Sequence, residues 1–170
     1  MRAAGVLLAT VLALALQTTL TRFIVRGTVA VDLVLVVVVY AALTTGPVTG
    51  LLTGTFAGLV QDALSSGVIG IGGLAKSVVG FMAGIIGTQF IVAQPLPRFV
   101  VFFAATLLHA VLFIGLYELL DLRTFGAPYG AVVGQGLGNA IVGVVAFQVA
   151  ELLPGAMERR RSSSRTRIRR

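Results

Sequence analysis

The stretch from Gly46 to Gly67 reads GPVTGLLTGTFAGLVQDALSSG, and its pattern decides how this chain is expected to fold. It opens with a Gly-Pro pair, a combination typical of a helix start, and then continues with apolar residues. Glycine recurs at every fourth position, and Asp62 occupies the next step of the same row. Residues four apart lie on one side of an α-helix, so this helix carries a strip without side chains.

Such a strip lets the backbone of a second helix approach closely, which is how many helices associate inside a lipid bilayer. The row drifts by about 40° at each step, which suits a right-handed crossing. Two interpretations stay open: packing against another helix of this chain, or docking of a membrane helix from a second protein. Similar rows of glycine in two other segments are Gly80 and Gly84, and Gly126, Gly130, Gly134 and Gly138.

The whole chain of 170 residues is as apolar as this stretch. Hydrophobic residues make up 57%, charged residues 11%, and the mean hydropathy is +1.01. Soluble domains contain about 45–50% apolar and about 25% charged residues, so an ordinary water-soluble domain is excluded. The absence of cysteine excludes disulfides, a CxxC redox site and a thiol nucleophile.

Apolar runs separated by Gly and Pro predict an all-α polytopic membrane protein, a compact bundle of about six transmembrane helices. The expected helices cover residues 3–20, 33–43, 48–64, 74–92, 99–120 and 129–153. They are expected to form one transmembrane domain over residues 1–157. A cleavable signal peptide is the alternative interpretation of the first run.

Residues 158–170 hold seven Arg and few apolar residues, which predicts a disordered cytoplasmic tail. These are Arg159, Arg160, Arg161, Arg165, Arg167, Arg169 and Arg170. With both termini on one side, that side has nine of the thirteen Lys and Arg residues, and the positive-inside rule assigns it to the cytoplasm. We expect the tail to fix the topology and to bind anionic lipids. Binding to nucleic acid or to an acidic protein is the alternative, and no nucleic-acid partner is predicted.

Two charged residues continue the glycine rows. Asp62 follows Gly58 by four residues, and Lys76 precedes Gly80 by four, so each is expected on a close-packed side of its helix. Charged groups inside membrane proteins usually pair or face a cavity. We therefore predict an ion pair between Asp62 and Lys76, or separate hydrogen bonds of each within the outer loop. A ligand-binding role is the alternative.

His109 follows Arg98 by eleven residues, about 16 Å along a helix, and is therefore expected near the membrane midplane. Its predicted hydrogen-bond partners are Gln135 and Asn139, which lie four residues apart on one side of the last helix. A proton-coupled function is the alternative to this structural role.

No catalytic constellation is found. The turn 64–67 lacks the first glycine of a membrane serine protease, and Ala75 replaces the glycine that a phosphate-binding loop requires before a Lys-Ser pair. Glu118 and Asp121 are close in sequence, but their position near a helix end favours a solvated cap. The sequence therefore predicts no enzyme, no catalytic residue, no cofactor and no metal site.

A longer pattern resembles a known family. It runs from Asp32 through Tyr40, continues as Gly46-Pro47-x-x-Gly50-x-x-x-Gly54-x-x-x-Gly58-Leu59-x-x-Asp62-x-x-Ser65-x-Gly67-x-x-Gly70, and ends in Gly80-Phe81-x-x-Gly84. Over residues 32–87 the chain resembles the rod shape-determining protein MreD family. Lys76 and His109 have no secure counterpart in the family pattern.

The resemblance implies a non-catalytic subunit of the complex that directs lateral peptidoglycan synthesis and rod cell shape, in the bacterial cytoplasmic (inner) membrane. Its implied direct partner is MreC, which has a single membrane helix, with RodA, a penicillin-binding transpeptidase and MreB in the same assembly. The family also resembles the substrate-capture subunits of energy-coupling-factor transporters in its six-helix layout.

These observations predict a glycine-lined groove that receives the membrane helix of MreC. The residues expected in partner binding or helix packing are Gly46, Pro47, Gly50, Gly54, Gly58, Asp62, Ser65, Gly67, Gly80 and Gly84. The alternative is a transporter subunit that captures a vitamin-like small molecule in an outer cavity bounded by Arg22, Arg26, Asp62, Lys76 and Glu118. A chain with no Trp and three Tyr favours the groove.

Overall fold

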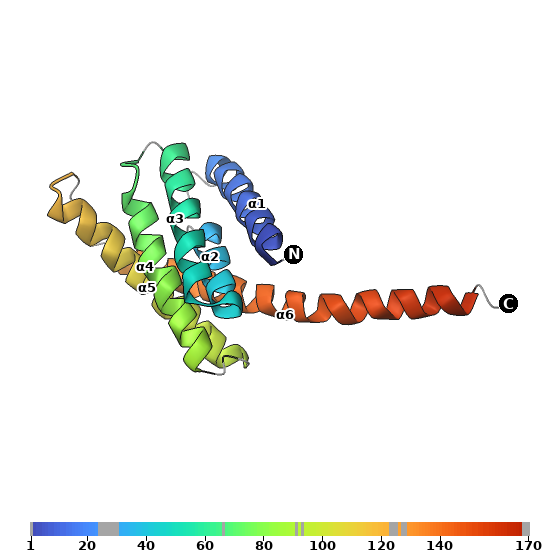
Figure 1. The fold of residues 1–170 in the computed structure, drawn as a ribbon. Helices are drawn as coiled ribbons and strands as arrows, with labels where there is room; N and C mark the ends of the chain where they lie inside the picture. The colour runs from blue at the N-terminus through green and yellow to red at the C-terminus, as the bar shows by residue number, and fades with distance from the viewer. Residues whose placement is uncertain are drawn as a thin grey trace.

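The computed structural model describes residues 2–23, 31–65, 67–90, 92, 94–122, 126 and 129–167, and within these ranges the side chains of residues 4–19 and 31–152. The described part of the chain is all-helical, as predicted. The helices are α1 (Arg2–Phe23), α2 (Leu33–Thr45), α3 (Pro47–Leu64), α4 (Ile71–Gln89), α5 (Pro95–Leu119) and α6 (Tyr129–Arg167) (Figure 1).

Three helical segments of the described chain are long and apolar enough to cross a membrane: α4, α5 and residues Tyr129–Leu152 of α6. The apolar segments of α1 and α2, Ala4–Thr19 and Leu33–Thr45, are shorter. The 13 residues of α2 extend for only about 20 Å, whereas the hydrocarbon core of a bilayer is about 30 Å thick. A membrane location fits the structure, and the prediction of six complete spans stays a prediction.

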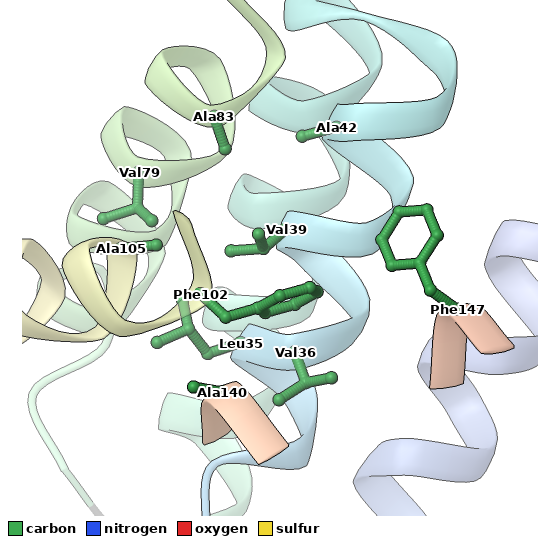
Figure 2. Packing of buried hydrophobic residues seen from close by; sticks show 10 residues of the cluster. All are labelled: Leu35, Val36, Val39, Ala42, Val79, Ala83, Phe102, Ala105, Ala140 and Phe147. Carbon is green, nitrogen blue, oxygen red and sulfur yellow. The ribbon is translucent and has the colours of Figure 1, made fainter. Parts of the chain in front are cut away.

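Helix α2 forms the centre of the bundle. It is apolar on all sides, as a fully buried helix is expected to be, and it contacts each of the other five helices. Val34 and Val38 pack toward α1 and α3, whereas Leu35 and Val39 belong to the main hydrophobic core. Figure 2 shows Phe102 of α5 lying beside the α2 residues of that core. The short helix is therefore held by packing on every side.

A one-residue turn at Gly46 joins α2 to α3. Gly46 has φ 101° and ψ 177°, a conformation that only glycine adopts without strain, and Pro47 begins the next helix with its fixed φ. The amide of Gly46 still donates to the carbonyl oxygen of Ala42, at 2.9 Å, which completes the end of α2. The turn brings α3 back alongside α2.

Helices α5 and α6 pack through two glycines that the sequence did not single out. A Cβ atom at Gly136 would lie 2.9 Å from the ring of Phe103, and one at Gly143 would lie 2.6 Å from the ring of Phe102. The four-residue row beginning at Gly126 does not form one packing strip: Gly126 precedes α6, and a Cβ atom at Gly130 would meet nothing within 4 Å. Glycine is therefore required on α6 where an aromatic ring of α5 lies against the helix backbone.

The backbone of α6 is helical as far as Arg167, where the sequence predicted a disordered tail from residue 158 onward. Figure 1 shows this C-terminal part extending beyond the other helices. The tail side chains lie outside the described residues. The division into a transmembrane domain and a tail, and the roles of the tail arginines, therefore stay predictions.

Candidate functional site

Helices α3 and α4 pack antiparallel, with their backbones in close contact along the glycine rows. A Cβ atom at Gly50 would lie 2.3 Å from the carbonyl oxygen of Gly80, and one at Gly84 would lie 2.3 Å from Cα of Pro47. At the other end of the strip, a Cβ atom at Gly58 would lie 2.5 Å from Cα of Gly73. Any side chain at these positions would force the two helices apart.

The same strip accounts for the position of Lys76. Gly54 faces the backbone of Lys76, whose carbonyl oxygen would lie 2.3 Å from a Cβ atom at residue 54. Because α4 fills the strip of α3, the groove expected there for a second protein is not open in this structure. The glycine rows act within the chain, and a partner surface has to lie elsewhere.

Asp62 forms a cap for the start of α4. Its Oδ2 accepts hydrogen bonds from the amides of Gly70, at 2.9 Å, and Gly73, at 3.2 Å. Gly70 is the N-cap of α4 and has no side chain of its own to accept these bonds, so the carboxylate at the end of α3 takes that role. A Cβ atom at Gly72 would lie 2.2 Å from Oδ1 of Asp62, which explains why small residues surround this carboxylate.

The loop between α3 and α4 is also held by α5. The hydroxyl oxygen of Tyr117 accepts a hydrogen bond from the amide of Val68 at 3.2 Å, and it would lie 3.2 Å from a Cβ atom at Gly67. Ser65 ends α3, with its amide bonded to the carbonyl oxygen of Gln61. Ser65 and Gly67 therefore position the loop that brings Asp62 to the α4 N-terminus.

The predicted ion pair between Asp62 and Lys76 is wrong. Lys76 is only 3% exposed and forms its ion pair with Asp32, with 2.9 Å between Nζ and Oδ2. Nζ also donates to Nε2 of His109 at 3.1 Å. Asp32 precedes α2 and is far from Lys76 in sequence, so sequence proximity favoured the wrong carboxylate. The alternative prediction is half right: Asp62 does bond within the loop, whereas Lys76 does not.

The predicted partners of His109, Gln135 and Asn139, are also wrong, because the hydrogen bond of His109 that the structure describes joins it to Lys76. Asn139 instead joins α6 to α2 and α5: its Oδ1 accepts from the amide of Asp32 at 2.8 Å, and its Nδ2 donates to Oγ1 of Thr106 at 3.0 Å. Asp32 is the N-cap of α2 and also accepts from the amide of Leu35, at 2.9 Å. The sequence signal for this network was Asp32 directly before a run of seven apolar residues, because a carboxylate buried at the start of such a helix needs a cation.

These polar groups line a cavity of about 420 Å³ at the end of the bundle where α3 ends and α2 and α4 begin. All six helices or their caps contribute to it. Its polar lining residues are Gln17, Asp32, Gln61, Asp62, Ser65, Lys76, His109, Tyr117 and Gln135. Of the residues expected around an outer cavity, Asp62 and Lys76 line this one, Glu118 does not, and the side chains of Arg22 and Arg26 lie outside the described residues.

A different arrangement holds the opposite end. Arg98 is buried, donates from Nε to the carbonyl oxygen of Val92 at 3.1 Å, and pairs with Glu151 of α6. Its guanidinium carbon lies 4.4 Å from the centre of the Phe147 ring. This cluster fastens the start of α5 to α6.

The outer face of the α3–α4 hairpin carries a shallow groove of about 500 Å³. Its rim consists of exposed apolar side chains, and its floor contains the hydroxyls of Thr55 and Ser77, which are 2.6 Å apart. The lining residues are Leu51, Thr55, Leu59, Gly70, Gly73, Leu74, Ser77, Val78, Phe81 and Met82. Small residues in the floor and apolar residues at the rim are typical of helix–helix contacts in membranes.

Within the described residues, no group of three or more His, Cys, Asp and Glu side chains could hold a metal ion. No curated protein and no solved structure matches the chain. The family described as rod shape-determining protein MreD matches residues 2–148, which is most of the chain. This family consists of membrane proteins of the shape-determining system and is not known for enzymatic activity. The chain therefore belongs to the rod shape-determining protein MreD family.

Proposed function

We propose that this chain is a non-catalytic membrane subunit of the bacterial cell-elongation complex that binds the membrane helix of MreC. By holding MreC, it helps to control lateral peptidoglycan synthesis, together with RodA, a penicillin-binding transpeptidase and MreB. Family membership supports a role in rod shape determination. The observation that carries the proposal is the groove on the outer face of the α3–α4 hairpin.

The groove offers what a single membrane helix needs for docking. One of the two hydroxyls donates to the other across 2.6 Å, and the second donates to a backbone carbonyl oxygen of its own helix, that of Leu51 for Thr55 or that of Gly73 for Ser77. Both hydroxyls can therefore lie in lipid without an unsatisfied donor. Each hydroxyl oxygen can still accept a weak contact from an approaching helix. The rim residues Leu74, Phe81 and Met82 are exposed and extend along the direction of the hairpin. A partner helix would bury these residues against its own side chains.

The test is to fill the groove. In Thr55→Leu, a larger side chain occupies the floor, and copurification of MreC with the tagged chain from membranes is expected to fall about tenfold or more, because close packing drives such association. The matched control is Thr44→Leu. Thr44 also donates to the carbonyl oxygen four residues before it, at 2.9 Å, but it lines a different groove, between α1 and α2.

Thr44→Leu is expected to retain MreC at the level of the unaltered chain. Loss of MreC in Thr44→Leu with retention in Thr55→Leu would move the interface to the α1–α2 groove. Retention in both variants would contradict the proposed interface on either groove.

The proposal also includes location and orientation. We propose that the chain lies in the bacterial cytoplasmic membrane with both termini in the cytoplasm, where the Arg-rich tail binds anionic lipids. The cavity end of the bundle then faces the outside of the cell. The excess of Lys and Arg on the side of the termini supports this orientation.

The alternative function, capture of a vitamin-like molecule for a transporter, has one supporting observation. The polar cavity of about 420 Å³ falls in the size range of small-molecule sites. Protein purified from native membranes, denatured and analysed by mass spectrometry would release a stoichiometric vitamin if it were a capture subunit. Release of no such molecule, together with copurified MreC, would favour the scaffold.

A further inference from the structure

We propose that the cavity at the outer end of the bundle binds a primary ammonium group, from an aminophospholipid headgroup or from a free small amine. The proposal goes beyond MreC binding, because the cavity and the α3–α4 groove are different surfaces. It rests on charge, on an unpartnered acceptor, and on the shape of the space around them.

The described lining of the cavity has two carboxylates, Asp32 and Asp62, but one cation, Lys76. Lys76 is already paired with Asp32 at 2.9 Å. Among the described residues, Asp62 receives hydrogen bonds from backbone amides only, and no cation lies within ion-pair distance of it. Because His109 accepts from the ammonium of Lys76, its Nε2 carries a lone pair and adds no charge there. A monovalent cation would balance the lining.

The residue next to Asp62 supplies the second observation. Oε1 of Gln61 is buried and has no hydrogen-bond partner among the described residues. Gln61 lines the same cavity as Asp62. A buried carbonyl without a donor is unfavourable, so a ligand that brings an N–H group to this wall would satisfy it. A carboxylate and an amide oxygen on neighbouring residues favour a cation that also donates hydrogen bonds.

Helix α5 adds an aromatic wall. The rings of His109 and Phe113 have centres 5.7 Å apart, and those of Phe113 and Tyr117 are 4.9 Å apart. All three side chains line the cavity. Aromatic faces attract cations such as an ammonium group, which makes this lining better suited to an organic cation than to an anion.

A neighbouring space shows how a lipid could reach the site. A second cavity, of about 470 Å³, shares Gln17, Gln61 and Ser65 with the first. It lies between α1 and α3, and its remaining walls include the apolar residues Leu14 and Leu64. The two spaces share these polar residues, and Leu64 of the second is exposed on the surface of the bundle, so an amphiphile fits with its headgroup inward and its chain toward the bilayer.

The experiment uses the full chain in nanodiscs of phosphatidylglycerol, a lipid without an amine. Thermal unfolding is followed by circular dichroism while either phosphatidylethanolamine is added to the discs or free ethanolamine to the buffer. A rise in Tm with either supports the ammonium site, and which one acts identifies the source. Choline and phosphatidylcholine are expected to be weaker, because a quaternary ammonium has no N–H for Gln61.

Two variants test the assigned residues. Asp62→Asn keeps an oxygen for the amides of Gly70 and Gly73 but removes the charge, so the apparent affinity is expected to fall about tenfold or more with the fold retained. Gln61→Met removes the unpartnered carbonyl and is expected to weaken binding without loss of stability. Glu118→Gln is the matched control, since it removes an exposed carboxylate at the same end of the bundle and is expected to bind normally.

Three results would overturn the proposal: no response to either amine, an equal response to sodium or potassium salt alone, or unchanged binding in both variants. Copurification of MreC is expected to be the same in Asp62→Asn as in the unaltered chain. Failure of the ammonium site and failure of the proposed MreC interface are therefore distinguishable.

Discussion

At the residue scale, two features decide the structure around the candidate site: glycines where backbones touch, and one buried lysine. Gly54 is required because the backbone of Lys76 passes directly over it. Lys76 is required because Asp32 is buried beside it and needs a cation. The two features are linked, since the close approach at Gly54 sets where the α4 backbone lies and hence where the side chain of Lys76 begins.

Gly54→Ala is expected to destabilise the protein by about 1–3 kcal/mol, because the added methyl group would lie 2.3 Å from the carbonyl oxygen of Lys76 and the helices must separate. Gly115→Ala is the matched control on α5: a Cβ atom there meets nothing within 4 Å, and alanine favours a helix. Thermal unfolding measured by circular dichroism compares the two. Equal Tm values for Gly54→Ala and Gly115→Ala would contradict the packing argument.

Lys76→Met is expected to destabilise the protein by about 3–5 kcal/mol, because it leaves the carboxylate of Asp32 buried without a cation. Asp32→Asn in the same chain removes that charge, so the double variant should be more stable than Lys76→Met alone. A double-mutant cycle based on unfolding free energies measures the coupling. Purely additive effects would show that the pair is not coupled.

At the element scale, α3 and α4 form the best-defined unit of the bundle. Their contact is continuous from Pro47 and Gly84 at one end to Gly58 and Gly73 at the other. Asp62 then caps α4 across the loop, so the unit is closed at the cavity end by hydrogen bonds and along its length by glycine contacts. These contacts hold α3 and α4 in a fixed arrangement, so the groove on the face of the hairpin that is turned away from the bundle has a fixed shape. A docking surface requires such a fixed shape.

The cap makes a separate prediction. Asp62→Ala is expected to cost about 1–2 kcal/mol of stability and to speed hydrogen exchange at the amides of Gly70 and Gly73, which lose their acceptor. Asp62→Asn retains an acceptor oxygen and should protect both amides. Exchange measured by mass spectrometry on peptides covering 67–75 checks the difference. Equal exchange in the two variants would rule out the cap.

At the scale of the whole molecule, the two ends of the bundle differ in chemistry. Buried charges and amides converge on the cavity at one end, whereas Arg98, Phe147 and Glu151 fasten the other. Between them lies the apolar core around α2, seen in Figure 2. Because the two ends differ, the orientation of the bundle in the membrane decides on which side of the membrane the cavity lies.

The orientation can be tested directly because the chain has no cysteine. Val68→Cys, on the exposed loop at the cavity end, should react with a membrane-impermeant maleimide in intact spheroplasts. Gln94→Cys, at the opposite end, should react only after lysis. The reverse pattern would place the cavity in the cytoplasm.

The tail makes its own prediction at this scale. Replacing its seven Arg with Gln leaves two Arg on the predicted inner side against four Lys and Arg on the outer side. The positive-inside rule then favours the reverse orientation, so labelling of the Val68→Cys reporter in intact spheroplasts is expected to fall. Unchanged labelling in this variant would show that other parts of the chain fix the topology.

The sequence by itself determined the class, the helix positions and the family. High hydropathy and regular Gly-Pro punctuation predict an all-helical membrane protein, since both are local properties of the chain. The family resemblance seen over residues 32–87 extends to residues 2–148 in the family match. The glycine rows of α3 and α4 correctly marked the surfaces where backbones meet, because helical spacing is fixed by geometry, whereas the row beginning at Gly126 did not.

Only the tertiary structure decided which surfaces and charges meet. Lys76 pairs with Asp32 and not with Asp62, and α4 fills the strip of α3, leaving another face for a partner. Gly136 and Gly143 matter because the rings of Phe103 and Phe102 lie over them. Helical periodicity gives the side of a helix on which a residue lies. The neighbour on that side depends on how the other five helices pack around α2, which no local sequence pattern determines.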